Sequence, residues 1–165
     1  RDGEQLVKRY TVSTSRHGIG TEEGSNKTPS GRFRVAGEHG DGGEPGEIFI
    51  SRVASGKRGE EGDPHDHVQT RILWLDGLDP ENANTYSRYI YIHGTNAESL
   101  LGTPASHGCV RMSNLDVIDL YDRVPVGVDF AAGASSVNSP SSDFASNANS
   151  AIDASLVRSL APKSS

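Results

Sequence analysis

Apolar and polar residues alternate in several short stretches of this chain. A period of two is typical of β-strands, because successive side chains of a strand point to opposite faces. The stretch 31–35 (GRFRV) is the strictest, with Phe33 and Val35 predicted inward and two arginines outward. Strands rich in β-branched and aromatic residues are expected at residues 5–12, 31–35, 48–53, 68–75, 88–93 and 126–130.

Two of these strands carry further detail. Within residues 68–75 (VQTRILWL), Ile72 and Trp74 are expected on one face and Leu73 and Leu75 on the other. The run RYIYIH at residues 88–93 is the clearest strand of the chain. The segments between the strands are polar and rich in glycine, proline and asparagine, which indicates loops at 13–31, 38–46, 54–66 and 76–87.

One helix is expected, directly after the single cysteine. Ser113-Asn114-Leu115-Asp116 matches the start of a capping box, with Asp in place of the stronger partner Glu. Val124-Pro125 would end the helix. The apolar side of its three turns is predicted to consist of Leu115, Ile118 and Tyr121, with Val117 and Leu120 beside them.

From residue 131 onward the chain consists largely of serine, alanine and asparagine. So few apolar residues cannot bury enough surface to offset the entropy lost on ordering. We expect a folded domain over residues 1–130 and a low-complexity, mostly disordered tail over 131–165, with a weak helical patch at 151–160.

Composition narrows the fold class. The chain has 165 residues, enough for one domain with a real core, and combines 33% hydrophobic residues with 19 glycines. Low apolar content with frequent turn formers favours a loop-rich β protein over a helical bundle. The predicted fold is mostly β, a two-sheet sandwich or barrel-like domain with one short α-helix.

Charge and hydropathy exclude some function classes. The net charge of −6 argues against nucleic acid as a partner, because binding a polyanion requires clustered Lys and Arg. No apolar run approaches the roughly 20 residues of a membrane span, and no signal peptide is visible.

Candidate chemistry is concentrated in residues 90–114. Cys109 is the only cysteine, His107 precedes it by two residues, and His93 ends the clearest strand. A thiol with histidines in reach suggests a nucleophile and its base. The alternative is a small buried hydrophobe, which is common for free cysteines. The polar, glycine-bearing context Ser106-His107-Gly108-Cys109 is a poor place for a core side chain, and amides near Gly108 are candidates for an oxyanion hole.

These residues resemble a family. His93-Gly94-Thr95, followed by Ser106-His107-Gly108-Cys109-Val110-Arg111, is similar to the signature of the L,D-transpeptidases, the YkuD-type catalytic domain. Thr28-Pro29-Ser30-Gly31-Arg32-Phe33 is similar to the family's TPxGxF segment. The resemblance covers roughly residues 5–130.

The resemblance implies roles for individual residues. Cys109 would be the nucleophile, and His93 the general base, oriented by a backbone carbonyl such as that of Gly94. His107 would shape the pocket, while the amides of Gly108 and Cys109 would bind the oxyanion. Arg111 stands where members carry Asn or Arg, and a guanidinium there suits a substrate carboxylate. Ser106, grouped with the substrate site, is interpreted as a hydrogen-bonding turn residue.

The resemblance also implies an activity. The thiolate would attack the carbonyl of the third residue of a peptidoglycan tetrapeptide stem, release D-alanine and form a thioester, which a second stem amine would resolve into a 3→3 cross-link. Water as acceptor would give an L,D-carboxypeptidase, and a lysine of an envelope lipoprotein would give an anchoring enzyme. A wall-peptide-binding module without turnover is a separate alternative. The expected location is the bacterial cell envelope, with no cofactor and no metal.

Weaker candidates remain. His65-Asp66-His67 has metal-ligand residue types, but alternating side chains would straddle a strand, so a solvated loop is the interpretation. Zinc held by His93, His107 and Cys109 lacks the paired ligand spacing of structural sites. Tyr86 and Arg88 follow a flexible segment and are either groove-lining or simply exposed.

Overall fold

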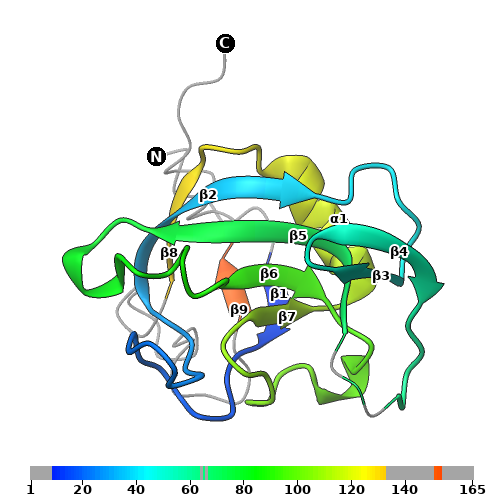
Figure 1. Ribbon diagram of the computed structural model, residues 1–165, viewed down its shortest axis with the longest axis horizontal. Helices are drawn as coiled ribbons and strands as arrows, with labels where there is room; N and C mark the ends of the chain where they lie inside the picture. Colours follow the sequence, from blue (N-terminus) through cyan, green and yellow to red (C-terminus); the bar gives the residue numbers. More distant parts are fainter. Residues whose placement is uncertain (1–8, 64, 66, 133–150, 154–165) are drawn as a thin grey trace.

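The computed structural model describes residues 9–63, 65, 67–132 and 151–153. In these residues the fold is mostly β with a single α-helix, as predicted (Figure 1). The strands are β1 (Arg9–Ser13), β2 (Gly31–His39), β3 (Glu47–Ile50), β4 (Val53–Arg58), β5 (Val68–Gly77), β6 (Tyr91–Gly94), β7 (Val110–Met112), β8 (Asp129–Ala132) and β9 (Ala151–Asp153). The helix is α1 (Asn114–Arg123), and short 3-10 helices lie at Pro80–Asn82 and Glu98–Leu100.

All of these strands belong to one hydrogen-bonded sheet that does not close into a barrel. Its main path is β4-β3-β5-β6-β7-β1-β9, and β2 pairs with both β5 and β8. Both β2 and β3 pair with the edge of β5 that lies opposite β6: β3 takes its first residues and β2 the remainder. β6 and β7 are parallel, whereas the other pairs are antiparallel.

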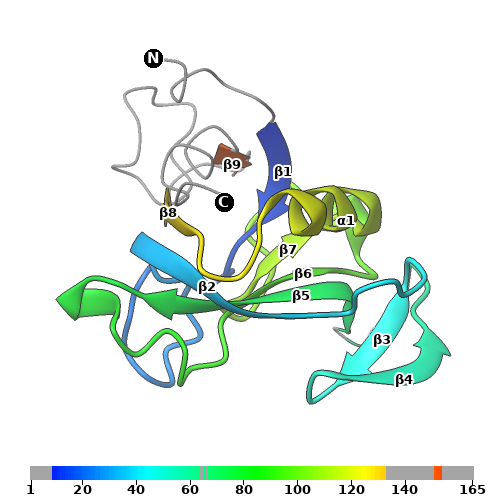
Figure 2. The same cartoon turned by 90° about the horizontal axis from the view of Figure 1, so that it is seen from above.

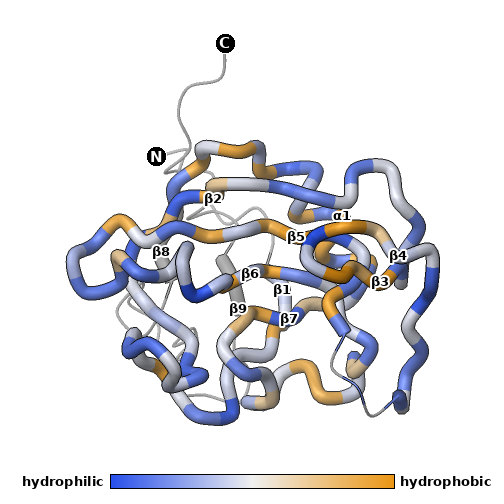
Figure 3. Tube along the Cα trace, in the orientation of Figure 1, coloured by the Kyte–Doolittle hydropathy of each residue, from blue (hydrophilic) through white to orange (hydrophobic). Residues whose placement is uncertain are grey.

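The two faces of the central strands bury different clusters, as the alternation in the sequence predicted. Leu73 and Leu75 belong to the larger core, while Ile72 and Trp74 belong to a smaller one on the opposite face. The larger core lies under α1, which covers one face of β5 and β6 (Figure 2). Apolar segments follow these central strands and α1, whereas the connecting loops are largely hydrophilic (Figure 3).

Helix α1 begins where the capping pattern predicted. The Ser113 hydroxyl accepts a hydrogen bond from the backbone N–H of Asp116 at 3.0 Å, which satisfies one of the otherwise unpaired amides of the first turn. Of the predicted apolar side, Val117, Leu120 and Tyr121 contact the core, but Leu115 is 71% exposed, so that residue was placed wrongly.

Several predicted boundaries differ from the structure. The expected loop at 54–66 contains β4, which forms a hairpin with β3. The expected strand at 88–93 begins only at Tyr91, because Tyr89 adopts a positive φ of 60° that interrupts the extended conformation. Strand β7 was not predicted, because three residues after a glycine turn carry too little periodicity to detect.

The predicted tail requires a correction. Residues 131 and 132 continue β8, which pairs with β2, and Ala151–Asp153 forms β9 against β1. The first three residues of the expected helical patch are therefore a strand. The rest of the expected disordered tail, residues 133–150 and 154–165, lies outside the described residues, as do residues 1–8, which include the first four residues of the strand expected at 5–12. Within the described part of the chain, no helix has the length and apolarity needed to cross a membrane.

Candidate active site

The parallel pair β6–β7 brings the predicted histidine and cysteine to one face of the sheet. Ile92 pairs with Val110 and His93 with Arg111, so the preceding residue of β6, Tyr91, lies opposite Cys109. Residues directly opposite each other in a pair point to the same face, as do alternate residues of one strand. His93 and Cys109 therefore share the face away from α1, one diagonal step apart.

The ring of His93 is fixed by its neighbour. Its Nδ1 lies 2.5 Å from the carbonyl oxygen of Gly94, and the side chain is 3% exposed. A carbonyl oxygen can only accept a hydrogen bond, so Nδ1 carries the proton and donates it. In the neutral ring the lone pair is then on Nε2. His93 is held in the tautomer that can accept a proton at Nε2.

Gly94 itself is held in a tight place. A Cβ at this position would lie 2.5 Å from Asn114 Oδ1 and 2.7 Å from the carbonyl oxygen of Gln69, so no other residue fits without movement. Asn114, the first residue of α1, accepts hydrogen bonds from Gln69 Nε2 and Thr70 Oγ1 and donates to the carbonyl of Thr95. These contacts fix the segment whose carbonyl orients His93.

The thiol of Cys109 lies at the end of an aromatic surface formed by Trp74, Tyr86 and Tyr89. Its Sγ lies 3.3 Å from the backbone N of Tyr91, which donates to it, and 3.4 Å from the carbonyl oxygen of Tyr89, to which the thiol donates. Cys109 is half-buried and packs against the cluster that contains Trp74. The alternative of a fully buried structural cysteine therefore does not describe this residue.

The turn before Cys109 is tied together by hydroxyl groups. Buried Ser106 accepts a hydrogen bond from Gly108 N at 3.2 Å and donates one to Cys109 O at 2.5 Å. Gly108 has a φ of +127°, which favours glycine. Its carbonyl accepts a hydrogen bond from Thr28 Oγ1 at 2.9 Å, and the Thr28 hydroxyl in turn accepts one from Ser15 N. The Thr-Pro-Ser-Gly segment thus supports the cysteine turn.

The remaining predicted site residues differ in their surroundings. Arg111 is 4% exposed and lies in register with His93 on the same face. His107 is exposed, with its ring centroid 6.0 Å from that of His17. The guanidinium of Arg88 donates to the backbone carbonyls of Gly20 and Lys27, so it anchors the loop between β1 and β2.

Tyr86 belongs to the aromatic surface beside the thiol. It is 41% exposed and stacks on Trp74 with ring centroids 4.1 Å apart. The guanidinium of Arg52 also lies over the Trp74 ring, at 4.6 Å, and donates to the Tyr91 hydroxyl. Tyr89 approaches the same Trp74 ring at 5.6 Å. This surface ends at the Tyr89 carbonyl that contacts Sγ.

Comparison with known proteins identifies the fold's family. The family model described as the L,D-transpeptidase catalytic domain matches residues 1–132. The chain belongs to the L,D-transpeptidase family. The resemblance carried by the His93 and Cys109 motifs is confirmed.

Individual L,D-transpeptidase relatives match shorter stretches. YqjB of Bacillus subtilis (strain 168), named as a candidate L,D-transpeptidase, is 39% identical over 68 residues, which are 41% of this chain and 36% of YqjB. YbiS of Escherichia coli (strain K12), named a probable L,D-transpeptidase, is 47% identical over 53 residues, which are 29% of this chain and 17% of YbiS. The matched part of the chain thus spans about a third of YqjB and less than a fifth of YbiS.

Sequence reasoning missed the groups that support this L,D-transpeptidase site. Asn114 was expected only as part of a helix start, and Thr28 only as part of a family motif. The carbonyl of Tyr89 was missed because its position depends on a positive φ in a residue that normally avoids it. No local pattern in the sequence indicates these contacts, because each joins segments far apart in the chain.

Proposed function

We propose that this chain is a cysteine acyltransferase of the L,D-transpeptidase type that forms 3→3 cross-links in peptidoglycan. The observation that carries the proposal is the shared face of His93 and Cys109, with the Nδ1 proton of His93 committed to the Gly94 carbonyl. A base with a defined lone pair beside a half-buried thiol is the arrangement that nucleophilic acyl transfer requires.

In the first step, His93 Nε2 takes the proton of the Cys109 thiol, and sulfur attacks the carbonyl carbon of the third residue of a tetrapeptide stem. The tetrahedral intermediate then breaks its C–N bond. The leaving amine of D-alanine takes the proton back from the imidazolium, and a thioester remains on Cys109. The backbone amides of Gly108 and Cys109 are the proposed oxyanion donors, and in the unliganded site the Gly108 amide donates to Ser106.

In the second step, the amine of another stem attacks the thioester and regenerates the thiol. Water in place of that amine would give a carboxypeptidase, and a lysine amine of an envelope lipoprotein would give an anchoring reaction. All three acceptors use the same acyl-enzyme. The substrate places the proposed activity in the bacterial cell envelope, and the chemistry requires neither a cofactor nor a metal.

Substrate recognition is proposed to use the same open face. Arg111 is the candidate for a stem carboxylate, although at 4% exposure it would be reached only by a group that enters deep beside His93. Tyr86 offers exposed aromatic surface near the thiol. His107 and Gly94 shape the site from the cysteine turn and the end of β6. Arg88 and Ser106 act through backbone contacts that hold the surrounding loops.

Product analysis tests the proposal. The protein is incubated with a disaccharide-tetrapeptide, and D-alanine, tripeptide and cross-linked dimers are quantified by mass spectrometry. We expect D-alanine release together with dimers, and loss of both in Cys109→Ala and His93→Ala. Tripeptide without dimers would show that the protein is a carboxypeptidase and not a transpeptidase.

The binding-module alternative has its own outcome in this experiment. A module that only binds wall peptides would release no D-alanine and would bind the tetrapeptide equally well with and without the Cys109→Ala substitution. Absence of D-alanine release from a folded wild-type protein would contradict the enzymatic proposal.

A further inference from the structure

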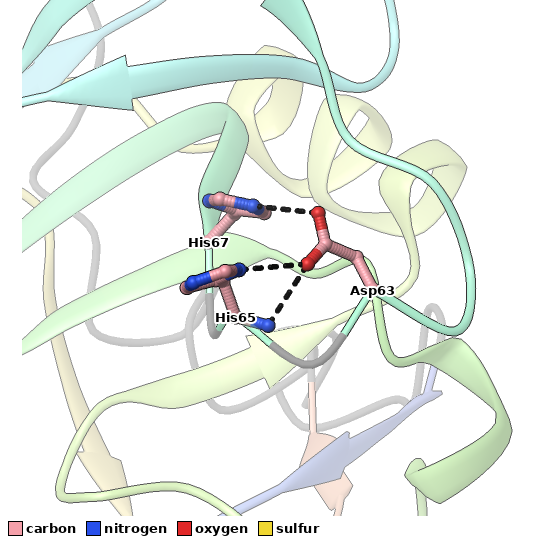
Figure 4. Close-up of side chains that lie close together, drawn as sticks. All are labelled: Asp63, His65 and His67. Atoms are coloured by element: carbon pink, nitrogen blue, oxygen red, sulfur yellow. Dashed lines mark hydrogen bonds and ion pairs between the residues drawn. The ribbon is translucent and has the colours of Figure 1, made fainter.

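A second cluster of titratable side chains lies outside the site described above. Asp63, His65 and His67 come from the loop between β4 and β5, and Figure 4 shows both rings directed at one carboxylate. Asp63 Oδ1 lies 3.0 Å from His65 Nδ1, and Asp63 Oδ2 lies 3.1 Å from His67 Nε2. Among the described residues this is the one group of three or more His, Cys, Asp or Glu with metal-ligand spacing.

This arrangement corrects the expectation drawn from the sequence. Alternation along a strand would have sent His65 and His67 to opposite faces, but His65 precedes β5 and the loop turns both rings to the same side. The partner that joins them is Asp63. The rings lie 5.8 Å apart between centroids, so neither blocks the other from a shared ligand.

The three ligand atoms lie within 4.8 Å of one another, and the two distances from the Asp63 carboxylate to the rings suit a small cation. Zinc binds imidazole nitrogen and carboxylate oxygen at about 2.0–2.2 Å, so two ligands of a tetrahedral zinc lie roughly 3.3 Å apart. The two distances from Asp63 to the rings are close to that value. Each ring nitrogen facing the carboxylate now donates a proton to it. On metal binding, that proton would leave to solvent and the other ring nitrogen would be protonated, which exposes the lone pair.

The loop that carries the cluster is held from below by one buried side chain. Asn96, which is 3% exposed, donates through Nδ2 to the carbonyls of Asp63 and His65 and accepts from the backbone N–H of His67. All three candidate ligands are thus positioned by the same amide. Metal sites depend on such supporting groups, whose loss typically weakens binding about 10–100-fold.

We propose that Asp63, His65 and His67 bind one zinc ion, with water in the remaining coordination position. The ligand set of two imidazoles and one carboxylate matches zinc and chemically similar divalent ions better than magnesium or calcium, which prefer oxygen. The ion would hold Asp63, His65 and His67 together within this loop, which Glu61 already joins to the segment after β6 by accepting from the backbone N–H groups of Glu98 and Ser99. This role is structural and separate from the thioester chemistry.

Zinc titration of the Cys109→Ala protein tests the proposal, since the thiol is itself a zinc ligand and must be removed first. We expect one zinc bound per chain by calorimetry, a rise of several degrees in melting temperature, and an absorption spectrum typical of tetrahedral cobalt when Co²⁺ is the probe. In the same background, His67→Ala, His65→Ala and Asp63→Asn should each weaken binding at least about tenfold.

His17→Ala is the matched control, because His17 is an exposed histidine that lies beside His107 rather than in the cluster. Its zinc affinity and melting shift should equal those of the parent protein. Magnesium and calcium should leave the melting temperature unchanged. The proposal is overturned if the parent binds no zinc, or if the three cluster substitutions leave the zinc affinity unchanged.

Discussion

Replacing Thr28 with valine tests how the cysteine turn is supported. Valine has nearly the shape of threonine, so the substitution removes the hydroxyl and little else. That hydroxyl donates to Gly108 O and accepts from Ser15 N, both at 2.9 Å, and Thr28 is 1% exposed. Thr28→Val therefore leaves one buried carbonyl and one buried amide without this partner.

The size of the effect follows from the cost of unpaired buried groups. Each buried donor or acceptor left unsatisfied costs about 1–3 kcal/mol, and partial relaxation of the loop recovers some of it. We expect Thr28→Val to lower the free energy of unfolding by about 2–4 kcal/mol. Thr28→Ser is the matched control: it keeps the hydroxyl and loses one buried methyl group, which costs about 1 kcal/mol.

Guanidinium chloride unfolding, followed by tryptophan fluorescence from Trp74, measures both variants against the parent. D-alanine release provides a second readout, since Gly108 precedes the nucleophile: it should fall in Thr28→Val and be largely retained in Thr28→Ser. If Thr28→Val is no less stable than Thr28→Ser, the two hydroxyl contacts do not support the turn and the reasoning is refuted.

Two further predictions concern stability. Burial, reinforced by the nearby charges of Asp41 and Asp122, raises the pKa of Glu38 to about 7. The folded state then holds a proton that the unfolded state loses above about pH 4.5, so stability should fall between pH 4.5 and 7. The full pKa difference corresponds to about 3 kcal/mol, which solvent screening of this half-buried carboxyl reduces to about 2 kcal/mol. Glu38→Gln should remove this slope in pH-dependent denaturation. Gly94→Ala should lower the free energy of unfolding by more than about 2 kcal/mol and abolish D-alanine release, because the new Cβ would lie 2.5 and 2.7 Å from oxygen atoms of Asn114 and Gln69. Gly37→Ala is the matched control: its Cβ meets nothing closer than 3.9 Å, so melting temperature and activity should both be unchanged.

The parts of the fold that the sequence predicted are those governed by local pattern. The alternation in β5 assigned Leu73 and Trp74 to opposite faces, because a strand with two buried faces still keeps its period of two. The cap at Ser113 was predicted because its hydrogen bond spans only three residues. The cysteine and histidine motifs indicated the family for the same reason: their residues are close together in the chain.

The parts that the sequence did not predict depend on contacts between distant segments. β7 is short and identifiable only through its pairing with β6 and β1. β9 lies in a region whose composition argues against order, and pairing with β1 defines it. Helix α1 buries Val117 and Leu120 of its predicted apolar side but leaves Leu115 in solvent. Tertiary context overrides a weak amphipathic pattern.

The cluster of Asp63, His65 and His67 illustrates the same limit. The sequence placed His65 and His67 near each other, but their orientation depends on the loop and on Asn96, which lies almost 30 positions away in the chain. The distant amide determines which side the rings face. The sequence therefore showed that residues of metal-binding type lie close together, but it did not predict their geometry.

The central claim is that Cys109 becomes an acyl carrier when His93 removes its proton. The most direct measurement is the intact mass of the protein after brief incubation with a tetrapeptide donor and no acceptor amine, followed by peptide mapping. The account predicts a mass increase equal to the donor minus D-alanine, located on Cys109 and absent or strongly slowed in His93→Ala. An unmodified Cys109 in the wild-type protein, or an adduct that forms equally fast without His93, would contradict it.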